Sequence, residues 1–151
     1  QFQENRVVKK YNCFVYGVPP EDDVETVIDR QIGRSAKDFR LWSAQRGAKG
    51  TLREAVTAYN VLIKGKDCSY LEVRPKTGRT HQIRVHLKAI NHPIICDKSY
   101  APKMPPLLGF GRLALHASSI CFNLLNGENR CFEAELPQDF EVALSLVKKK
   151  A

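Results

Sequence analysis

The sequence predicts one α+β domain in which a mainly antiparallel mixed sheet is flanked by helices. Segments with the two-residue alternation of strands outnumber segments with helical periodicity, and short turns join neighbouring strand segments as in hairpins. The chain has 151 residues, of which 43% are hydrophobic, and this is enough for one sizeable core and little more. We therefore expect residues 1–151 to lie in a single domain.

Strand signals dominate the first half of the chain. Residues 6–17 alternate throughout and predict a strand, which ends at a proline-containing turn over residues 17–23. Residues 24–50 are polar and basic and predict a loop with short strands. Residues 55–63 and 70–74 are rich in β-branched and aromatic side chains. The short turn between these two segments predicts an antiparallel hairpin.

A helix is predicted to follow this hairpin. Ile83, Leu87 and Ile90 are spaced i, i+4 and i+7 and form an apolar stripe. Thr80 is the expected N-cap, because its hydroxyl can accept a free N–H of the first helical turn. Asn91 tolerates the left-handed backbone conformation with which many helices end, and the proline two residues later prevents the helix from continuing.

The last third of the chain predicts a hairpin and a terminal helix. Residues 112–117 and 120–125 have the composition of strands. Asn126-Gly127 is the strongest short hairpin signal in the chain and predicts a partner strand at residues 130–135. A helix is expected after Pro137, and its buried stripe consists of Phe140, Ala143, Leu144 and Val147.

The charge balance of the chain favours a polyanionic partner. There are 24 Lys and Arg against 16 Asp and Glu, which gives a net charge of +8. Phosphate neutralisation dominates nucleic-acid affinity, so RNA or DNA is the first candidate. A basic assembly protein whose positive face meets an acidic partner is an alternative. A steep fall of RNA affinity with salt would distinguish the two.

The cysteines do not form a metal-binding pattern. Their number is five, and no CxxC pair is present, so zinc-knuckle spacing is absent. We expect reduced thiols, mostly in the core, in a protein from a reducing compartment. No apolar run approaches the roughly 20 residues of a membrane span.

The most informative stretch is residues 74–87, RPKTGRTHQIRVHL, on a predicted strand, turn and helix. Gly78 allows a tight turn, and the helix N-terminus beyond it can face an anion. This pattern is typical of a phosphate- or carboxylate-binding corner. A solvated basic face around the buried Ile83 and Leu87 is the alternative interpretation, and the residues alone favour it slightly.

The stretch closely resembles the third conserved motif of the RluA family of RNA pseudouridine synthases, P-x-T-G-R-T-H-Q-I-R-V-H-L. Four other segments resemble family motifs in the same order, and they are residues 6–11 (RVVKKY), 91–100 (NHPIICDKSY), 112–117 (RLALHA) and 136–140 (LPQDF). The chain differs at Asn91, Cys96 and Ala101, where the family commonly has glycine. The resemblance therefore extends over nearly the whole chain.

The resemblance implies a pseudouridine-synthase-like catalytic domain that isomerises uridine in rRNA or tRNA, with no cofactor and no metal. The nucleophilic aspartate of the family lies upstream of the first strand, between Arg-Leu and a Thr-Ser-Gly motif. None of the seven aspartates here has that context. We therefore expect residues 1–151 to be the C-terminal portion of one catalytic domain, inactive alone. Its expected partners are RNA and the missing part of the same domain.

Two further interpretations accompany this one. A non-catalytic RNA-binding protein that kept the fold and lost the aspartate is the alternative function. The expected location is the cytoplasm, or an RNA-containing organelle in a eukaryote, because the proposed substrate is RNA.

The resemblance also implies roles for particular residues. Arg84 pairs with the nucleophilic aspartate, and a guanidinium beside a carboxylate lowers the carboxylate pKa and orients its oxygens. Tyr11 stacks on the extruded base and its hydroxyl can relay the C5 proton. Leu115 lines the floor of the pocket. The candidates for phosphate contacts are Lys9, Lys76, Arg79, His81 and Lys88.

Each of these residues also has a structural interpretation. Arg84 would be an ordinary surface arginine on a helix, and Tyr11 and Leu115 would be core residues of strands. Asp97 and Tyr100 are expected to brace a loop. His81 and His86 are five residues apart, which differs from the i, i+4 spacing of paired helix ligands and argues against a metal.

Overall fold

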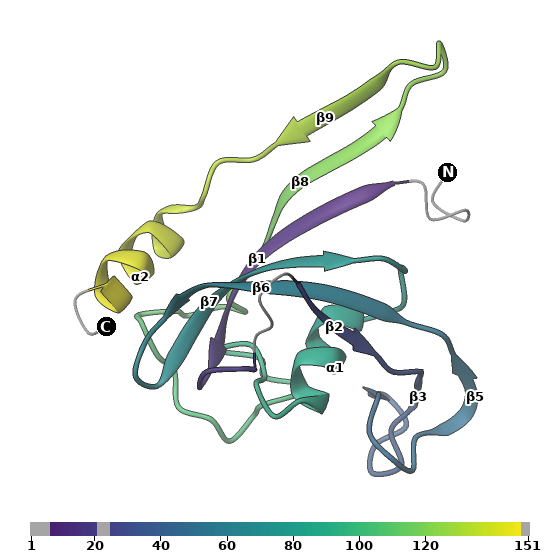
Figure 1. Cartoon of the computed structure of the whole chain (residues 1–151). Coiled ribbons are helices and arrows are strands. Elements are labelled where there is room, and N and C mark those ends of the chain that lie inside the picture. Colours follow the sequence, from purple (N-terminus) through teal and green to yellow (C-terminus); the bar gives the residue numbers. More distant parts are fainter. Residues whose placement is uncertain (1–6, 21–24, 149–151) are drawn as a thin grey trace.

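The computed structural model describes residues 7–20 and 25–148 (Figure 1). Six strands form the large sheet, and they are β1 (Val8–Tyr16), β2 (Thr26–Asp29), β6 (Val56–Lys64), β7 (Cys68–Pro75), β8 (Leu115–Asn123) and β9 (Asn129–Glu133). Their order is β2-β6-β7-β1-β8-β9, and every pairing between them is antiparallel. The two described helices are α1 (Gln82–Ala89) and α2 (Gln138–Lys148). The predicted α+β fold with a mainly antiparallel sheet is confirmed.

The two helices cover opposite faces of the large sheet. His86 of α1 hydrogen-bonds Thr57 of β6, and the register of β6, β7 and β1 places Tyr11 on that same face. Phe140 of α2 packs against Phe14, which points to the other face because it lies an odd number of residues from Tyr11. The centroids of the two phenylalanine rings are 5.5 Å apart.

A smaller sheet lies beside α1. It consists of β3 (Ile32–Arg34), β4 (Trp42–Ser43) and β5 (Lys49–Arg53), in the order β4-β3-β5. Ile32 is buried in a second core cluster with Val85 of α1 and Tyr100. We call residues 30–53 the basic lobe, which stands beside α1 in Figure 1. The prediction of a loop with short strands over residues 24–50 is confirmed.

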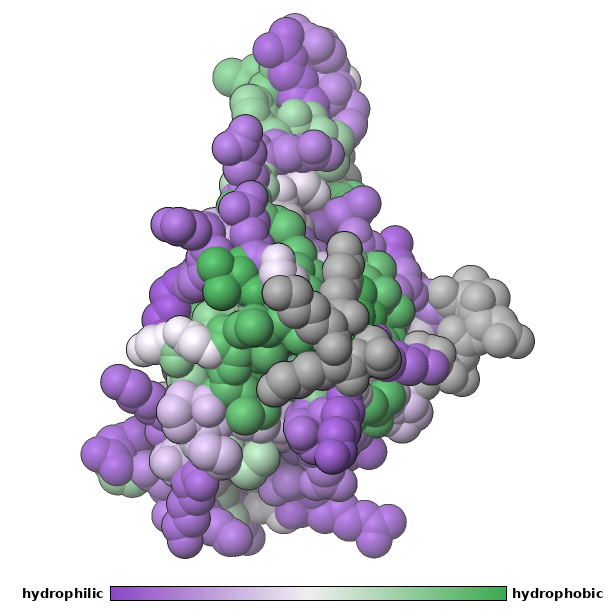
Figure 2. Space-filling view, turned by 90° about the vertical axis from the view of Figure 1, so that its left-hand side faces the viewer, coloured by the Kyte–Doolittle hydropathy of each residue, from purple (hydrophilic) through white to green (hydrophobic). Residues whose placement is uncertain are grey.

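The two predicted helical stripes are confirmed. Ile83 and Leu87 are buried and Ile90 packs against the main core, as do Phe140 and Val147 of α2. α2 nevertheless exposes other apolar side chains, since Val142 and Leu146 remain open to solvent. Figure 2 shows hydrophobic residues gathered in the middle of the side of the molecule on which α2 lies.

Two details of the predicted elements are wrong. Thr80 is not the N-cap of α1, because the cap position is occupied by His81 in the left-handed conformation, with φ 54° and no side-chain capping bond. Residues 112–117 and 120–125 are not two strands. They contribute to the single long strand β8, while the backbone of Ala114 bonds instead to Phe14 and Ile95. The left-handed prediction for Asn91 is confirmed by its φ of 67°.

The prediction of five reduced thiols is also wrong. Cys121 and Cys131 form a disulfide across the β8–β9 hairpin, whereas Cys13, Cys68 and Cys96 are free. The physical reason is the register of the hairpin. The Asn126-Gly127 turn makes Cys121 and Cys131 directly opposite partners, with their Cα atoms 4.0 Å apart. The two cysteines are ten residues apart in the sequence, so their pairing follows only from the register that the turn sets.

None of the described helices is long and apolar enough to cross a membrane.

Candidate active site

A pocket of about 250 Å³ opens where the start of α1 meets the large sheet. Its walls come from β1, from the turn after β7, from the first turn of α1 and from the start of β8. Six of the eight predicted site residues line it, and these are Lys9, Tyr11, Arg79, His81, Arg84 and Leu115. The fold therefore brings together residues that are separated by more than one hundred positions in the sequence.

Two predicted residues lie elsewhere. The Nζ atom of Lys76 is 4.0 Å from a carboxylate oxygen of Glu25, and its side chain is largely exposed. Lys88 lies on the side of α1 that faces the basic lobe, where its Nζ atom donates to the Tyr100 carbonyl oxygen. The structure thus leaves Lys9 and Arg79 as the cations that line the pocket beside Arg84.

Strand register explains how Tyr11 and Leu115 reach the pocket. Tyr11 pairs with Val73 of β7 on one side and with Ala117 of β8 on the other. Leu115 pairs with Cys13, which lies two residues from Tyr11 and therefore on the same face of the sheet. Both side chains project toward the face that α1 covers, so the pocket lies between the sheet and the helix.

A chain of buried polar side chains holds α1 against the large sheet. Gln82 donates from Nε2 to the Val56 carbonyl oxygen at 2.9 Å and to Thr57 Oγ1 at 3.0 Å, while its Oε1 accepts from Thr77 Oγ1 at 2.7 Å. The Arg79 backbone N–H also donates to Gln82 Oε1. Thr77 Oγ1 in turn accepts the Val56 N–H.

His86 extends the same chain to the basic lobe. Its Nε2 lies 2.9 Å from the Arg30 carbonyl oxygen, which can only accept, so Nε2 carries the proton. Nδ1 is therefore the acceptor for the Thr57 hydroxyl, 2.9 Å away. Sequence reasoning missed Thr77, Gln82 and His86 as positioning residues. The available signal was a pair of polar residues, Gln82 and His86, spaced i, i+4 beside the apolar stripe of the helix.

Burial lowers the pKa of His86, and this predicts acid sensitivity of the fold. The unfolded chain takes up a proton on His86 near pH 6.5, whereas the folded chain does so only at lower pH. The free energy of unfolding should therefore fall below pH 6.5, by up to about 1.4 kcal/mol per pH unit from this residue. Urea unfolding at pH 7.5, 6.5 and 5.5 measures this fall.

The matched control for this prediction is His86→Asn. The variant should be less stable than the wild type at pH 7.5, because the shorter Asn side chain cannot make both the Thr57 and the Arg30 hydrogen bonds of His86. Its stability should also change less between pH 6.5 and 5.5. Equal pH slopes in the two proteins would show that His86 is not the group responsible.

Arg84 is held by an ion pair with Asp97. The guanidinium donates from Nε to Oδ2 at 2.8 Å and from Nη2 to Oδ1 at 2.7 Å, and it lies 4.8 Å from the centre of the Tyr100 ring. The hydrogen bonds to Asp97 raise the pKa of Arg84. Asp97 Oδ1 also accepts the backbone N–H groups of Ser99 and Tyr100 at 3.0 Å. Asp97 thus braces its loop, and it also orients Arg84.

Tyr100 connects the pocket to the basic lobe. Its hydroxyl lies 2.9 Å from His81 Nδ1 and accepts the Trp42 backbone N–H at 3.2 Å. Burial is the first cause that lowers the pKa of His81, and Arg84 is the second. Both effects favour the neutral form of His81, in which the ring serves the pocket as a hydrogen-bonding group.

No carboxylate of the described residues lines this pocket. The Asp97 carboxylate contacts Arg84, which lines the pocket, but Asp97 itself is buried and its oxygens accept hydrogen bonds from Arg84, Ser99 and Tyr100. Within the described residues, Arg84 uses Nε and Nη2 for its hydrogen bonds, and Nη1 forms none. The arrangement therefore combines an oriented cation, a tyrosine and an apolar floor, and it can accept a planar group together with an incoming anion.

Comparison with known proteins gives a consistent result. The family of RNA pseudouridylate synthases matches residues 1–89. The chain is 37% identical over 150 residues to the Bacillus subtilis protein named uncharacterized RNA pseudouridine synthase YlyB, a match that covers 99% of this chain and 47% of the relative. It is 35% identical over 163 residues to ribosomal large subunit pseudouridine synthase D of Neisseria meningitidis, covering 100% of this chain and 41% of that protein.

Solved structures resemble the chain over most of its length. Human RNA pseudouridylate synthase domain containing 4 superposes with a TM-score of 0.75 at 26% identity, over 97% of this chain and 64% of that one. Human RNA pseudouridylate synthase domain containing 1 gives a TM-score of 0.71 at 28% identity, over 92% of this chain and 58% of that one. The chain spans about half the length of the curated relatives it matches.

Proposed function

This chain belongs to the RNA pseudouridylate synthase family, and we propose on that premise that the protein isomerises uridine to pseudouridine in RNA at the pocket around Tyr11 and Arg84. The observation that supports this proposal most is the convergence of Tyr11, Arg84 and Leu115 from three distant segments into one pocket. The target atoms of a stacked uridine are inaccessible, so the nucleotide has to be extruded into such a pocket.

Tyr11 and Leu115 are proposed to hold the extruded base. The Tyr11 ring offers a stacking surface, which is worth about 1–3 kcal/mol per base in single-stranded nucleic-acid complexes. Leu115 supplies an apolar contact at the floor of the same pocket. The Tyr11 hydroxyl is proposed to relay the proton that leaves C5 when the base rejoins the sugar through that carbon.

Arg84 is proposed to orient the carboxylate that attacks the nucleotide. Because no carboxylate of the described residues lines the pocket, this group has to come from outside them. The bidentate pair with Asp97 fixes the guanidinium plane, and Nη1 forms no hydrogen bond within the described residues. A second carboxylate can therefore bind there, and a neighbouring guanidinium keeps it ionised.

Lys9 and Arg79 are proposed to contact the phosphates beside the target nucleotide. Both line the pocket, and Arg79 is anchored by donation from Nε to the Glu54 carbonyl oxygen at 2.9 Å. We propose rRNA as the first substrate to test and tRNA as the second. The ground for this order is the name of the relative from Neisseria meningitidis, ribosomal large subunit pseudouridine synthase D.

The proposed activity is tested by tritium release from RNA labelled at uridine C5, using the full-length protein. We expect release with the wild type and a fall of about 10²-fold or more in Tyr11→Phe, because general acid–base catalysis contributes that much. RNA affinity should stay unchanged in Tyr11→Phe, since the ring is kept. Tyr11→Leu is the matched variant that removes the ring, and it should weaken binding as well.

Absence of tritium release from rRNA and from tRNA, with RNA binding retained, would contradict the proposed activity and favour a non-catalytic RNA-binding protein. Equal activity of Tyr11→Phe and the wild type would leave the activity in place but exclude the proton relay. A loss of RNA binding in Tyr11→Phe would show that the hydroxyl contacts the substrate in its ground state.

A further inference from the structure

The basic lobe concentrates most of the net charge of the chain. Residues 30–53 contain seven basic residues and one acidic residue, Asp38, which gives a net charge of +6. Asp38 is occupied by its neighbour Arg40, with 2.8 Å between Arg40 Nη2 and Asp38 Oδ2. Four other cations of the lobe make no ion pair with any described residue, and these are Lys37, Arg46, Lys49 and Arg53.

Two aromatic side chains lie among these charges. Phe39 is 79% exposed at the end of an ordered turn, where it adds nothing to the core. The turn is held by Ser35 and Leu41, whose backbones bond at 2.9 Å. Arg34 stacks on the Trp42 ring at 4.0 Å and donates to the Phe39 carbonyl oxygen at 3.2 Å. The exposed ring is therefore presented from a braced backbone.

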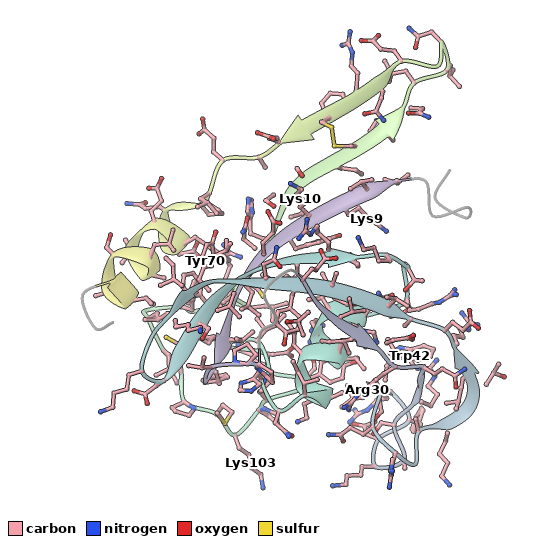
Figure 3. All side chains as sticks on the ribbon, in the orientation of Figure 1. Lys9, Lys10, Arg30, Trp42, Tyr70 and Lys103 are labelled. Carbon is pink, nitrogen blue, oxygen red and sulfur yellow. A yellow bond between two sulfur atoms is a disulfide. The ribbon has the colours of Figure 1, made fainter. Side chains whose placement is uncertain are left out.

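A cleft of about 250 Å³ separates the lobe from α1. Its walls include Lys37, Trp42, Arg46, Val85, Lys88 and Tyr100. A shallower groove on the lobe adjoins it and is lined by Phe39 and by the cations Arg34, Lys37 and Lys49. In Figure 3 Trp42 and Arg30 lie on the same side of the molecule, beside α1. The two hollows share residues 35–38, so they form one continuous basic surface with aromatic rings in it.

This surface adjoins the candidate active site through α1 and Tyr100. Arg84 lines the pocket, while Val85 and Lys88 of the same helix line the cleft. The Tyr100 hydroxyl contacts His81 of the pocket and the Trp42 backbone of the lobe. A strand of RNA that leaves the pocket can therefore continue across one turn of helix onto the lobe.

We propose that the basic lobe binds the single-stranded RNA that flanks the target nucleotide, with a base stacked on Phe39 and phosphates on Lys37 and Lys49. Exposed aromatic rings interleaved with unpaired cations are how proteins bind single strands without base-specific readout. A duplex hides its base faces, so only a single strand can stack a base on the exposed Phe39 ring. The position of the strand beside the active site rests on the proposed function, whereas the binding surface itself does not.

The first test replaces Phe39. Binding of a fluorescein-labelled single-stranded RNA to the full-length protein is followed by fluorescence anisotropy at fixed salt. Phe39→Leu keeps an apolar side chain and removes the ring, so we expect affinity to fall by about 5- to 100-fold, the range for loss of one base–aromatic stack. Phe39→Tyr keeps the ring and should bind within about twofold of the wild type. Unchanged affinity of Phe39→Leu would overturn the proposal.

The second test separates local contacts from general attraction. Lys37→Ala/Lys49→Ala removes two charges from the lobe, and Lys66→Ala/Lys103→Ala removes two exposed charges elsewhere, with Lys103 well away from Trp42 in Figure 3. Removing one lysine–phosphate interaction should reduce the slope of log affinity against log salt by about 0.7. We expect a reduction of about 1.4 for the lobe pair and almost none for the control pair. Equal reductions would overturn the proposal.

The same variants distinguish failure of this proposal from failure of the proposed function. At saturating RNA, Phe39→Leu should release tritium with the wild-type kcat and a raised KM, because the ring binds substrate away from the reacting atoms. If no variant and no wild-type protein releases tritium while Phe39→Leu still binds RNA weakly, the proposed activity fails and the RNA surface stands. If tritium is released and Phe39→Leu has an unchanged KM, the RNA surface alone fails.

Discussion

Arg84→Met is expected to lower the rate of pseudouridine formation by about 10²- to 10³-fold or more while leaving RNA affinity close to that of the wild type. One preorganised electrostatic interaction with a reacting group contributes that much to kcat. Met keeps the packing of the unbranched part of the side chain but cannot orient a carboxylate. Single-turnover tritium release at saturating RNA measures the chemical step, and anisotropy measures the affinity.

The ion pair with Asp97 complicates this experiment, and a second variant resolves it. Arg84→Met leaves Asp97 buried without its guanidinium partner, so part of any loss could come from a disturbed loop. Arg84→Met/Asp97→Asn removes the stranded charge and keeps an oxygen for the Ser99 and Tyr100 N–H groups. We expect the double variant to recover stability and to stay inactive. Recovered activity would contradict the proposed role of Arg84.

The fold was largely predictable because its information is local. The alternation in β1, the composition of β6 and β7 and the Asn126-Gly127 turn each specify a strand or a register within a few residues. The small sheet of the basic lobe was not predictable in this way. Its strands β4 and β3 have two and three residues, which is too few to show any periodicity. Those strands form because Ile32 is buried against α1 and Tyr100.

The candidate pocket was predictable for a different reason. Tyr11 and Arg84 came from a family resemblance, and the register of β1 and the start of α1 place both in one pocket. The partner of Arg84 was missed because Asp97 lies thirteen residues away, on a loop whose path no local pattern specifies. Lys88 was predicted near the pocket because a spacing of four residues from Arg84 indicates a shared helix face. In the structure Arg84 lines the pocket, whereas Lys88 lines the cleft beside the basic lobe.

Thr80 shows how tertiary contacts override a local preference. Threonine is a good N-cap, but the first turn of α1 is organised by Gln82, whose side chain accepts the Arg79 N–H and bonds to β6. His81, between Arg79 and Gln82 in the chain, takes the left-handed conformation, and its Nδ1 lies within hydrogen-bond distance of the Tyr100 hydroxyl. The helix therefore starts where the buried polar network places it.

Asp97→Ala is expected to be the most destabilising single substitution at the site, with a loss of about 3–5 kcal/mol in the free energy of unfolding. The carboxylate is fully buried and binds Arg84 in bidentate geometry, so its removal leaves a mostly buried guanidinium without an anion. The backbone N–H groups of Ser99 and Tyr100 lose their acceptor as well. Urea unfolding at pH 7.5 measures the loss.

Asp97→Asn is the matched control, since it keeps the shape and one acceptor oxygen and removes only the charge. Its expected cost lies below that of Asp97→Ala, because the loop keeps an oxygen for its two N–H bonds while Arg84 loses a charged partner. Equal losses in both variants would show that the charge pair alone carries the stability. A loss below about 1 kcal/mol in Asp97→Ala, the value typical of an exposed pair, would show that water replaces Asp97 at Arg84 and that the pocket does not hold the guanidinium in place.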